Sequence, residues 1–346
     1  MCGYRLKLPQ VSWLKKSNLL IGGLSLLALS LVTISGGAWY LLGEHSPLGS
    51  RGASSQETLP LDRFPVGVDP ERRLIVENPA VEDFVATYLP YALDRSDRFL
   101  TRLVAALASR AWVQQLASVS NRTLVIYAGE RHEEVVKNFG DILGWSKAER
   151  AEFKRLVSEA EPTLFEGKFF PGRYVVPRGS QPELVASLVN QRFSQNILSR
   201  YDHSVALQVP LSDALTIASL LEREAYDFAD MRVISGIIWN RLFIDMPLQL
   251  DASLQYARGS RPSEPRWWPA VRPNDKFIDS PFNTYQEKGL PPTPISNPSV
   301  AAVVAALNPK STECLFYFHD RRGGFYCTET YEEHVKKLNE VYGLSR

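Results

Sequence analysis

The stretch LSDALTIASLLEREA, Leu211–Ala225, has the pattern of a helix around which the rest of the chain is organised. Its apolar residues recur at steps of three and four, so they share one helical face. Ser212 or Asp213 is the expected N-cap, because short polar side chains accept hydrogen bonds from the first free N–H groups. The apolar positions are Leu211, Ala214, Leu215, Ala218, Leu221 and Ala225.

Glu222 lies on this apolar face, because positions 211, 215, 218 and 222 form one helical row. Glu224, two residues on, points elsewhere. An isolated carboxylate on a buried stripe is costly to ionise, which predicts a raised pKa, as a general acid needs at neutral pH. Glu222 is therefore a candidate catalytic residue. The alternative is a structural glutamate that pairs with an arginine, for which the candidates are Arg223, Arg232 and Arg241.

The composition narrows the function classes. At 346 residues the chain is long enough for two or three compact domains, and its net charge of +1 argues against nucleic-acid binding. No Gly-rich phosphate loop appears, and the histidines are scattered without ligand spacing, so neither a metal site nor a cofactor is expected. The histidines are His45, His132, His203, His319 and His334.

Residues Ser17–Gly43 contain no charged side chain and are long enough to span a bilayer. Basic residues precede this span, which places a short N-terminal tail in the cytoplasm and the remaining chain outside. A cleaved signal peptide is the competing interpretation, but the stretch is long for such a segment and no small-x-small site ends it. We therefore expect a retained anchor. The preceding basic residues are Arg5, Lys7, Lys15 and Lys16.

The segment from residue 79 to the central helix has two parts. Helical spacing runs through 79–119, and then Thr123–Tyr127 predicts a strand, followed by helices over Glu133–Leu143 and Ser146–Val157. This order resembles a LysM-like module, although its closing strand is either missing or lies in Gly172–Val176. A generic packing module is an equal alternative to a sugar-binding one.

The remaining chain predicts further helices and a hairpin. Helices are expected over Ser180–Arg200, over Asp227–Phe243 with Asp227 as N-cap, and over Ser299–Ala306. A proline-rich, loop-rich region follows residue 243. Near the C-terminus, two short alternating strands at 315–318 and 325–328 predict a β-hairpin, and a helix over Tyr331–Tyr342 closes the chain.

Several phrases in this part resemble the MltG (YceG-like) family of endolytic murein transglycosylases over about residues 166–342. The motif NTY…GLPPTPISNP is the most specific of them. The phrases are ASLLEREA (218–225), IIWNRL (237–242), MPLQLDASLQYARG (246–259), SPFNTYQEKGLPPTPISNPS (280–299), ALNP (306–309) and LFYFHDRRGGFYCTETYEEH (315–334).

The resemblance implies cleavage of the β-1,4 bond between N-acetylmuramic acid and N-acetylglucosamine within peptidoglycan strands, with a 1,6-anhydro product end. Glu222 matches the catalytic glutamate of the family. It would protonate the leaving oxygen and then accept the proton of the substrate's own C6 hydroxyl, so one carboxyl suffices. Substrate-binding positions carried over from the family motifs are Gln249, Asp251, Tyr256, Asn283, Thr284, Tyr285 and Asn297, although asparagine and threonine beside proline often only fix turns.

The resemblance also implies an organisation and a location. The predicted fold is α+β, with one N-terminal transmembrane helix, a LysM-like α/β module and an α+β catalytic domain that ends in a β-hairpin. We expect a single-pass protein of the bacterial inner membrane that binds peptidoglycan strands and works beside peptidoglycan synthases or elongation and division proteins. The expected boundaries are a cytoplasmic tail over 1–16, the transmembrane helix over 17–43, a linker over 44–78, a helical element over 79–120, the module over 121–160 and the catalytic domain over 161–346.

Two other functions stay open at this point. One is a membrane-anchored scaffold that binds peptidoglycan or division proteins without catalysis, and the other is a water-using muramidase with Glu224 or Asp251 as second carboxylate. The chain also departs from the family pattern. Ala252-Ser253 replaces a common Pro-Thr pair, and Phe325 stands where the hairpin usually carries histidine. Trp267 and Trp268 could either stack on sugar rings or anchor their loop.

The cysteines predict a disulfide. Cys314 and Cys327 flank the hairpin turn, which would place them nearly opposite each other on the two strands. An oxidising compartment favours a bond between such a pair, whereas two small buried thiols are the alternative. Cys2, on the cytoplasmic side, should stay reduced.

Overall fold

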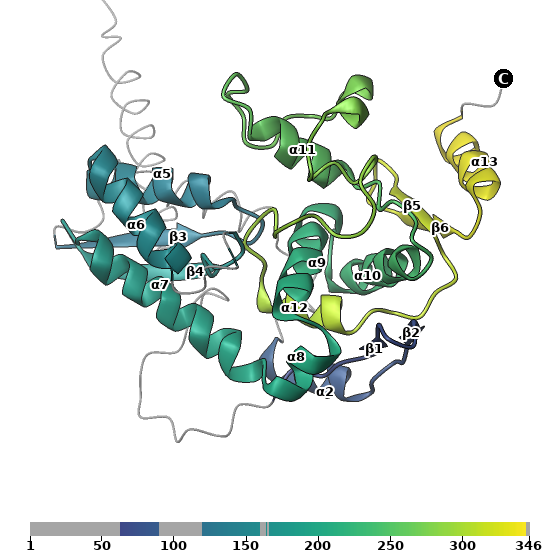
Figure 1. Cartoon of the computed structure of the whole chain (residues 1–346), viewed down its shortest axis with the longest axis horizontal. Coiled ribbons are helices and arrows are strands. Elements are labelled where there is room, and N and C mark those ends of the chain that lie inside the picture. Colours follow the sequence, from purple (N-terminus) through teal and green to yellow (C-terminus); the bar gives the residue numbers. More distant parts are fainter. Residues whose placement is uncertain (1–62, 90–119, 160–163, 165, 344–346) are drawn as a thin grey trace, which may run out of the picture. The chain divides into compact units, whose positions relative to one another are not determined.

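The computed structural model describes residues 63–89, 120–159, 164 and 166–343 (Figure 1). All of these residues fall within one compact unit, Thr58–Arg346. No helix in this described part is long and apolar enough to cross a bilayer. The predicted span Ser17–Gly43, Cys2 and residues 90–119 of the helical element expected over 79–120 lie outside the described residues.

A small module combines two strands and two helices. Strand β3 (Asn121–Ile126) is followed by helices α5 (His132–Leu143) and α6 (Lys147–Glu159), and strand β4 (Gly172–Pro177) closes the module. The strands pair antiparallel, from Asn121 opposite Pro177 to Ile126 opposite Gly172. The predicted strand and helices are confirmed. Of the two possibilities for the closing strand, missing or within Gly172–Val176, the structure shows the second.

Helix α7 (Pro182–Asn196) connects the module to the rest of the protein. Its first half packs Val185 and Val189 into the core of the module, whereas Phe193 near its end packs into a larger core. The sequence predicted one helix through residue 200. The chain instead tightens into a 3-10 turn, η2 (Leu198–Arg200), and a short helix α8 (His203–Gln208) follows.

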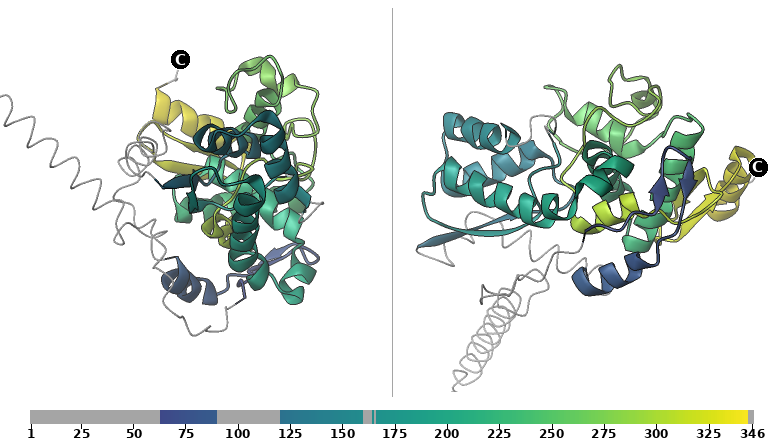
Figure 2. Two further views of the ribbon diagram at one scale, coloured as in Figure 1. Left: turned by 90° about the vertical axis from the view of Figure 1, so that its left-hand side faces the viewer. Right: turned by 60° about the horizontal axis from the view of Figure 1, so that its bottom comes forward.

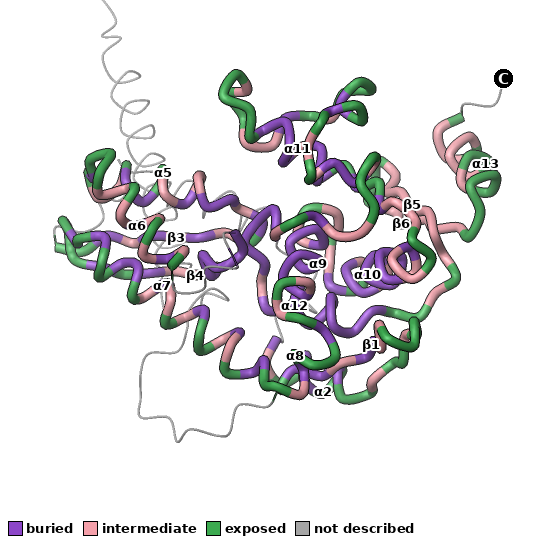
Figure 3. Tube along the Cα trace, viewed as in Figure 1, coloured by how far each residue is buried: buried purple, intermediate pink, exposed green. Residues whose placement is uncertain are grey.

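The larger core is built around three helices, α9 (Leu211–Glu224), α10 (Phe228–Phe243) and α12 (Val300–Leu307), which pack on one another (Figure 2). Every residue of α12 is buried, and so is every residue of α9 from 214 to 221 (Figure 3). The central helix is therefore covered on all sides over these two turns and has no single buried face there. Its polar side chains adapt by bonding to their own helix: Thr216 Oγ1 donates to the carbonyl of Ser212 (2.8 Å).

Helix boundaries follow local caps in some places and not in others. Asp227 caps α10 as predicted, because its carboxylate accepts the N–H of Asp230 at 2.9 Å. The N-cap of α9 is Pro210, with an extended backbone, and neither Ser212 nor Asp213 caps the helix. The helix starts earlier than predicted, because only Val209 and Pro210 separate it from α8 and the fixed φ of Pro210 (−55°) is compatible with entry into a helix.

Part of the predicted linker belongs to the fold. Strands β1 (Val68–Asp69) and β2 (Leu74–Ile75) pair, helix α2 (Ala80–Tyr88) follows, and Phe64 lies buried in the larger core. The N–H of Gly67 donates to the carbonyl of Leu307 at 2.8 Å. The expected linker therefore does not reach residue 78, because apolar side chains near its end pack beside α12.

The proline-rich region holds one further helix, α11 (Asp251–Gly259), and a 3-10 turn, η3 (Pro273–Phe277), neither of which the sequence indicated. The C-terminal prediction is confirmed. Strands β5 (Phe316–His319) and β6 (Phe325–Thr328) form the hairpin, and α13 (Tyr331–Tyr342) closes the described chain without a buried residue.

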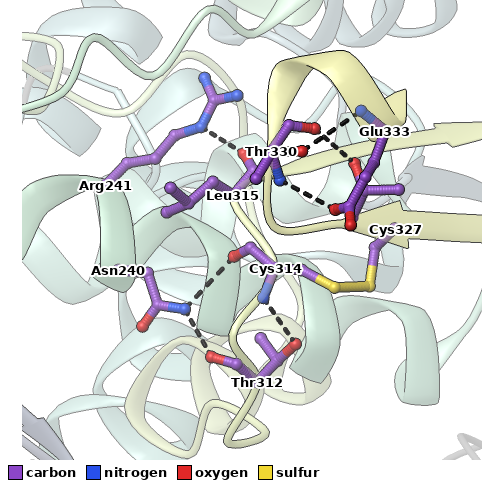
Figure 4. The surroundings of a disulfide bond; sticks show 9 residues. Asn240, Arg241, Thr312, Cys314, Leu315, Cys327, Thr330 and Glu333 are labelled. Carbon is purple, nitrogen blue, oxygen red and sulfur yellow. Dashed lines mark hydrogen bonds between the residues drawn. A yellow bond between two sulfur atoms is a disulfide. The ribbon is translucent and has the colours of Figure 1, made fainter. Parts of the chain in front are cut away.

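A disulfide joins Cys314 and Cys327, with Cα atoms 5.8 Å apart (Figure 4). The two are not opposite each other in the hairpin, because Cys327 pairs with Tyr317. Cys314 instead lies before β5, in a segment held to helix α10. Asn240 Nδ2 donates to the carbonyls of Thr312 (2.7 Å) and Cys314 (3.3 Å), so the disulfide connects this segment to the second strand.

Candidate active site

Glu222 lies in the last turn of α9, half-buried, where it meets the start of α12. Its Oε1 accepts the backbone N–H of Ser299 at 2.8 Å. Ser299 is also the N-cap of α12, because its hydroxyl accepts the N–H of Ala302 at 3.2 Å. Glu222 is therefore not the isolated carboxylate that the periodicity suggested. A backbone donor at a helix N-terminus fixes the position of its carboxylate.

Two of the three arginines considered as structural partners of Glu222, Arg232 and Arg241, have other bonds. Arg232 pairs with Glu82 at 2.7 Å. Arg241 donates from Nε to the carbonyl of Leu315 at 2.7 Å. These two arginines hold α10 to its neighbours.

The turn between β3 and α5 of the module lies directly beside Glu222. A β-carbon added to Gly129, whose φ is +84°, would lie 3.8 Å from Cβ of Glu222 and 3.4 Å from Cδ of Arg223. The N–H of Gly129 also donates to the carbonyl of Asn297 at 2.9 Å. The module therefore forms part of the immediate surroundings of Glu222. The sequence predicted a turn at Ala128-Gly129 but gave no signal for its partner.

Trp268 anchors the proline-rich loop beside Glu222, through contacts to Arg223 and to the module. The guanidinium carbon of Arg223 lies 3.9 Å from the centre of the indole ring, and the indole N–H donates to Glu134 at 3.0 Å. Trp267 lies 5.4 Å from the guanidinium carbon of Arg131. Of the two roles considered for the tryptophan pair, these contacts fit the anchoring of the loop.

The turn between β3 and α5 carries a further carboxyl, Glu130, that the sequence did not single out. Burial raises the pKa of Glu130 to about 7, the charge of Glu134 adds to this, and a hydrogen bond from the N–H of Tyr127 (3.0 Å) partly opposes it. Near neutral pH the carboxyl therefore exists in both protonation states.

Glu224 points to the opposite side of the helix end, as predicted. Its two oxygens accept the N–H of Ala252 (3.0 Å) and the hydroxyl of Tyr317 (2.9 Å). Burial raises the pKa of Glu224, although these two hydrogen bonds partly oppose the shift. Glu224 thus holds the start of α11 and strand β5 to the end of α9.

Three of the predicted substrate-binding residues lie at or near the surface around the start of α11. Gln249 and Asp251 are exposed, and the hydroxyl of Tyr285 donates to Oδ1 of Asp251 at 2.7 Å. Gln249 has a φ of +51°, a conformation that costs free energy for a residue other than glycine. Its N–H bonds to the carbonyl of Thr284 at 2.9 Å, which keeps this strained residue in place.

The other four predicted substrate-binding residues are buried and bond within the protein. Asn283 Nδ2 donates to the carbonyl of Ile278 (2.8 Å), and Thr284 Oγ1 accepts the N–H of Leu250 (3.0 Å). Tyr256 lies beneath the guanidinium of Arg131, 4.2 Å from its central carbon. These contacts serve the internal structure of the protein, and Asn297 is likewise fully buried.

The comparisons with known proteins agree with this architecture. Residues 98–340 match the YceG-like family. The chain belongs to this family. The crystal structure of a yceG-like protein from Listeria monocytogenes has the same fold, with a TM-score of 0.55 and 23% identity over 80% of this chain and 98% of that chain.

Two curated relatives are named endolytic murein transglycosylase. The protein from Bacillus subtilis (strain 168) is 34% identical over 184 residues, which are 52% of this YceG-like chain and 49% of the relative. The protein from Streptococcus pneumoniae (serotype 2 strain D39) is 30% identical over 176 residues, 51% of this chain and 32% of the relative. The match thus spans half or less of these relatives.

The structure shows the surroundings of the positions at which this YceG-like chain departs from the family pattern. Ser253 donates to the carbonyl of Leu250 (2.7 Å) and bonds to the hydroxyl of Thr284 (2.8 Å), which stabilises the first turn of α11. In the hairpin, His319 lies directly opposite Phe325 and contacts Asp230 at 3.2 Å. An imidazole is therefore present beside the unusual phenylalanine, on the other strand.

One group of potential metal ligands forms only in three dimensions. Nδ1 of the buried His132 lies 2.6 Å from Glu166 and 3.2 Å from Glu133. The three side chains bring ligand atoms within 4.8 Å of one another. However, Arg131 bonds to both carboxylate oxygens of Glu133. The donor set therefore fits an internal ion-pair cluster better than a metal site, because a guanidinium already neutralises one of the carboxylates.

Proposed function

We propose that this YceG-like protein is an endolytic peptidoglycan lytic transglycosylase. It would cleave the β-1,4 bond between N-acetylmuramic acid and N-acetylglucosamine inside glycan strands and leave 1,6-anhydro-muramic ends. Membership of the family supports this proposal, as do the names of the relatives from Bacillus subtilis and Streptococcus pneumoniae.

The observation that carries the proposal is the placement of Glu222. Glu222 lies at the end of a buried helix, where its Oε1 accepts the N–H of Ser299. In the proposed reaction Glu222 gives its proton to the glycosidic oxygen as the bond from that oxygen to C1 breaks. The C6 hydroxyl of the same sugar attacks C1 and returns its proton to Glu222. No water is consumed, and intramolecular attack avoids the entropy of bringing in a second reactant.

The muramidase alternative needs a second carboxylate that is free to act as base or nucleophile. Both oxygens of Glu224 accept hydrogen bonds, from Ala252 and Tyr317. One oxygen of Asp251 accepts the hydroxyl of Tyr285. Of the two candidates, Glu224 is therefore the less suited to act as a second carboxylate, because both of its oxygens are already hydrogen-bonded.

The proposal extends to where the protein is located and which proteins it works beside. The uncharged span Ser17–Gly43 would anchor the protein once in the bacterial inner membrane, with its body outside the cytoplasm. There it would cut strands made by peptidoglycan synthases, beside elongation or division proteins, and so limit strand length. The order strand, helix, helix, strand over β3 to β4 supports a LysM-like identity for the module.

Mass analysis of the products tests the function. The full chain is incubated with purified peptidoglycan strands, and the ends of the released fragments are identified. Anhydro ends are expected. Reducing ends would instead support a muramidase, and intact strands would support a scaffold without catalysis.

A further inference from the structure

Asn297 is a fully buried residue that joins the module to the helical core. Its Nδ2 donates to the carbonyl of Glu130 at 2.8 Å, and its Oδ1 accepts the N–H of Phe169 at 2.9 Å. Glu130 lies in the β3–α5 turn, and Phe169 belongs to the apolar core of the module. Both polar atoms of the side chain are therefore used by the module.

The backbone of Asn297 bonds to the same turn. Its N–H donates to the carbonyl of Glu130 at 2.8 Å, and its carbonyl accepts the N–H of Gly129 at 2.9 Å. Each of the four polar groups of this residue thus contacts the module. Hydrogen bonds in such a buried place resist displacement, because a broken one leaves polar groups without water.

Two residues further on, the same segment reaches Glu222. Ser299 provides the N–H that binds Oε1 of Glu222, and Pro298 between the two restricts the backbone. Pro298 is itself enclosed, since a β-carbon on Gly167 would lie 3.8 Å from its Cδ. Any shift of Asn297 would therefore move the donor that fixes Glu222.

We propose that Asn297 is a positioning residue for Glu222, through which the module sets the geometry of the active site. The module would then be a structural part of the catalytic centre and not only a separate glycan-binding unit. This inference rests on the proposed role of Glu222. Such positioning matters because a displacement of about 1 Å at a catalytic group can cost on the order of 100-fold in rate.

A matched control exists at the other end of α12. Asn308 is also buried, and its Nδ2 donates to the carbonyls of Pro65 (2.7 Å) and Val304 (2.9 Å). Asn308→Ala removes a comparable buried amide without touching the segment before Ser299. Asn297→Ala and Asn308→Ala should therefore destabilise the protein alike, and only the first should disturb Glu222.

The test compares the two variants in the full chain by kinetics. We expect Asn297→Ala to lower kcat about 10- to 100-fold with KM changed less than about threefold. Asn308→Ala should keep kcat within about threefold of the wild type. If Asn297→Ala does not fold, Asn297→Asp is used, because it keeps the acceptor for Phe169 and loses the donor to Glu130.

A second measurement is independent of activity. The exchange rate of the Ser299 amide hydrogen, followed by NMR, should rise at least about tenfold in Asn297→Ala relative to Asn308→Ala. Equal exchange and equal kcat in the two variants would overturn the inference. A wild type that leaves no anhydro ends would instead refute the proposed function, while the exchange comparison would still test the link from Asn297 to Ser299.

Discussion

Glu222 and Glu224 are two residues apart in the same helical turn, yet they bond to different parts of the protein. Both accept a backbone N–H near the start of a later helix: Glu222 from Ser299 before α12, and Glu224 from Ala252 in α11. Beyond that they differ. The module turn lies beside Glu222, whereas the hydroxyl of Tyr317 from the hairpin covers the second oxygen of Glu224.

This difference teaches how similar carboxyls acquire different roles. Glu224 connects three elements and has hydrogen bonds to both oxygens, which is the situation of a structural residue. Glu222 accepts the N–H of Ser299 at the boundary between the module and the helical core. The end of α9 thus has a module side, with Glu222, and a hairpin side, with Glu224.

The sharpest test of this comparison is the pair Glu222→Gln and Glu224→Gln. Glu222→Gln removes the proposed proton donor with little change in shape, so we expect kcat to fall about 10²–10⁴-fold or more. Glu224→Gln should keep kcat within about tenfold and mainly change stability. Cleavage rates and thermal unfolding of both variants are measured together. Normal turnover in Glu222→Gln, with loss in Glu224→Gln, would show that the roles are reversed.

The second prediction concerns the hairpin side. Replacing Cys314 and Cys327 with serine opens a link between residues 13 apart, which should lower the free energy of unfolding by about 2–4 kcal/mol. Urea unfolding measures this loss. The kcat of the folded protein should change much less than in Glu222→Gln, because the hairpin bonds to Glu224. A loss of kcat as large as that of Glu222→Gln would contradict the separation of the two sides.

The third prediction uses the titration of Glu130 on the module side. Because its folded pKa of about 7 exceeds the unfolded value of 4.5, its contribution to stability is complete below pH 4.5 and is lost as the pH rises to about 7. Glu130→Gln imitates the protonated form, so its stability relative to the wild type should increase over this interval, by up to about 3 kcal/mol. Urea unfolding at pH 4.5, 6 and 8 measures the trend. A difference that does not vary with pH would contradict it.

The smallest expected effect separates two functions of Ser299. Ser299→Ala loses the cap of α12, which should cost about 1 kcal/mol of stability, but keeps the N–H that binds Glu222. Ser299→Pro loses both, and its backbone φ of −77° suits proline. We therefore expect kcat to fall about 10- to 100-fold in Ser299→Pro only, in line with one hydrogen bond to a charged group. Equal kcat in both variants would mean that this N–H does not matter for the activity.

The sequence by itself determined the elements whose signals are local. The hairpin, helix α13 and the Asp227 cap follow from residues a few positions apart, and helical periodicity alone separated the directions of Glu222 and Glu224. The phrases around Glu222 also identified the family. Such features are readable because turns, caps and periodicity depend on near neighbours in the chain.

Tertiary structure decided the surroundings of those elements. The sequence did not indicate helix α11, because its first turn is capped from outside, by Glu224 of α9. Helix α9 is buried on all sides because α10 and α12 pack on it. Asn297 looked like a sugar ligand, yet it bonds to Glu130, 167 residues away, and Ser299 reaches Glu222 across 77 residues. No local pattern encodes these pairs, because contacts at such separations depend on how the whole chain packs.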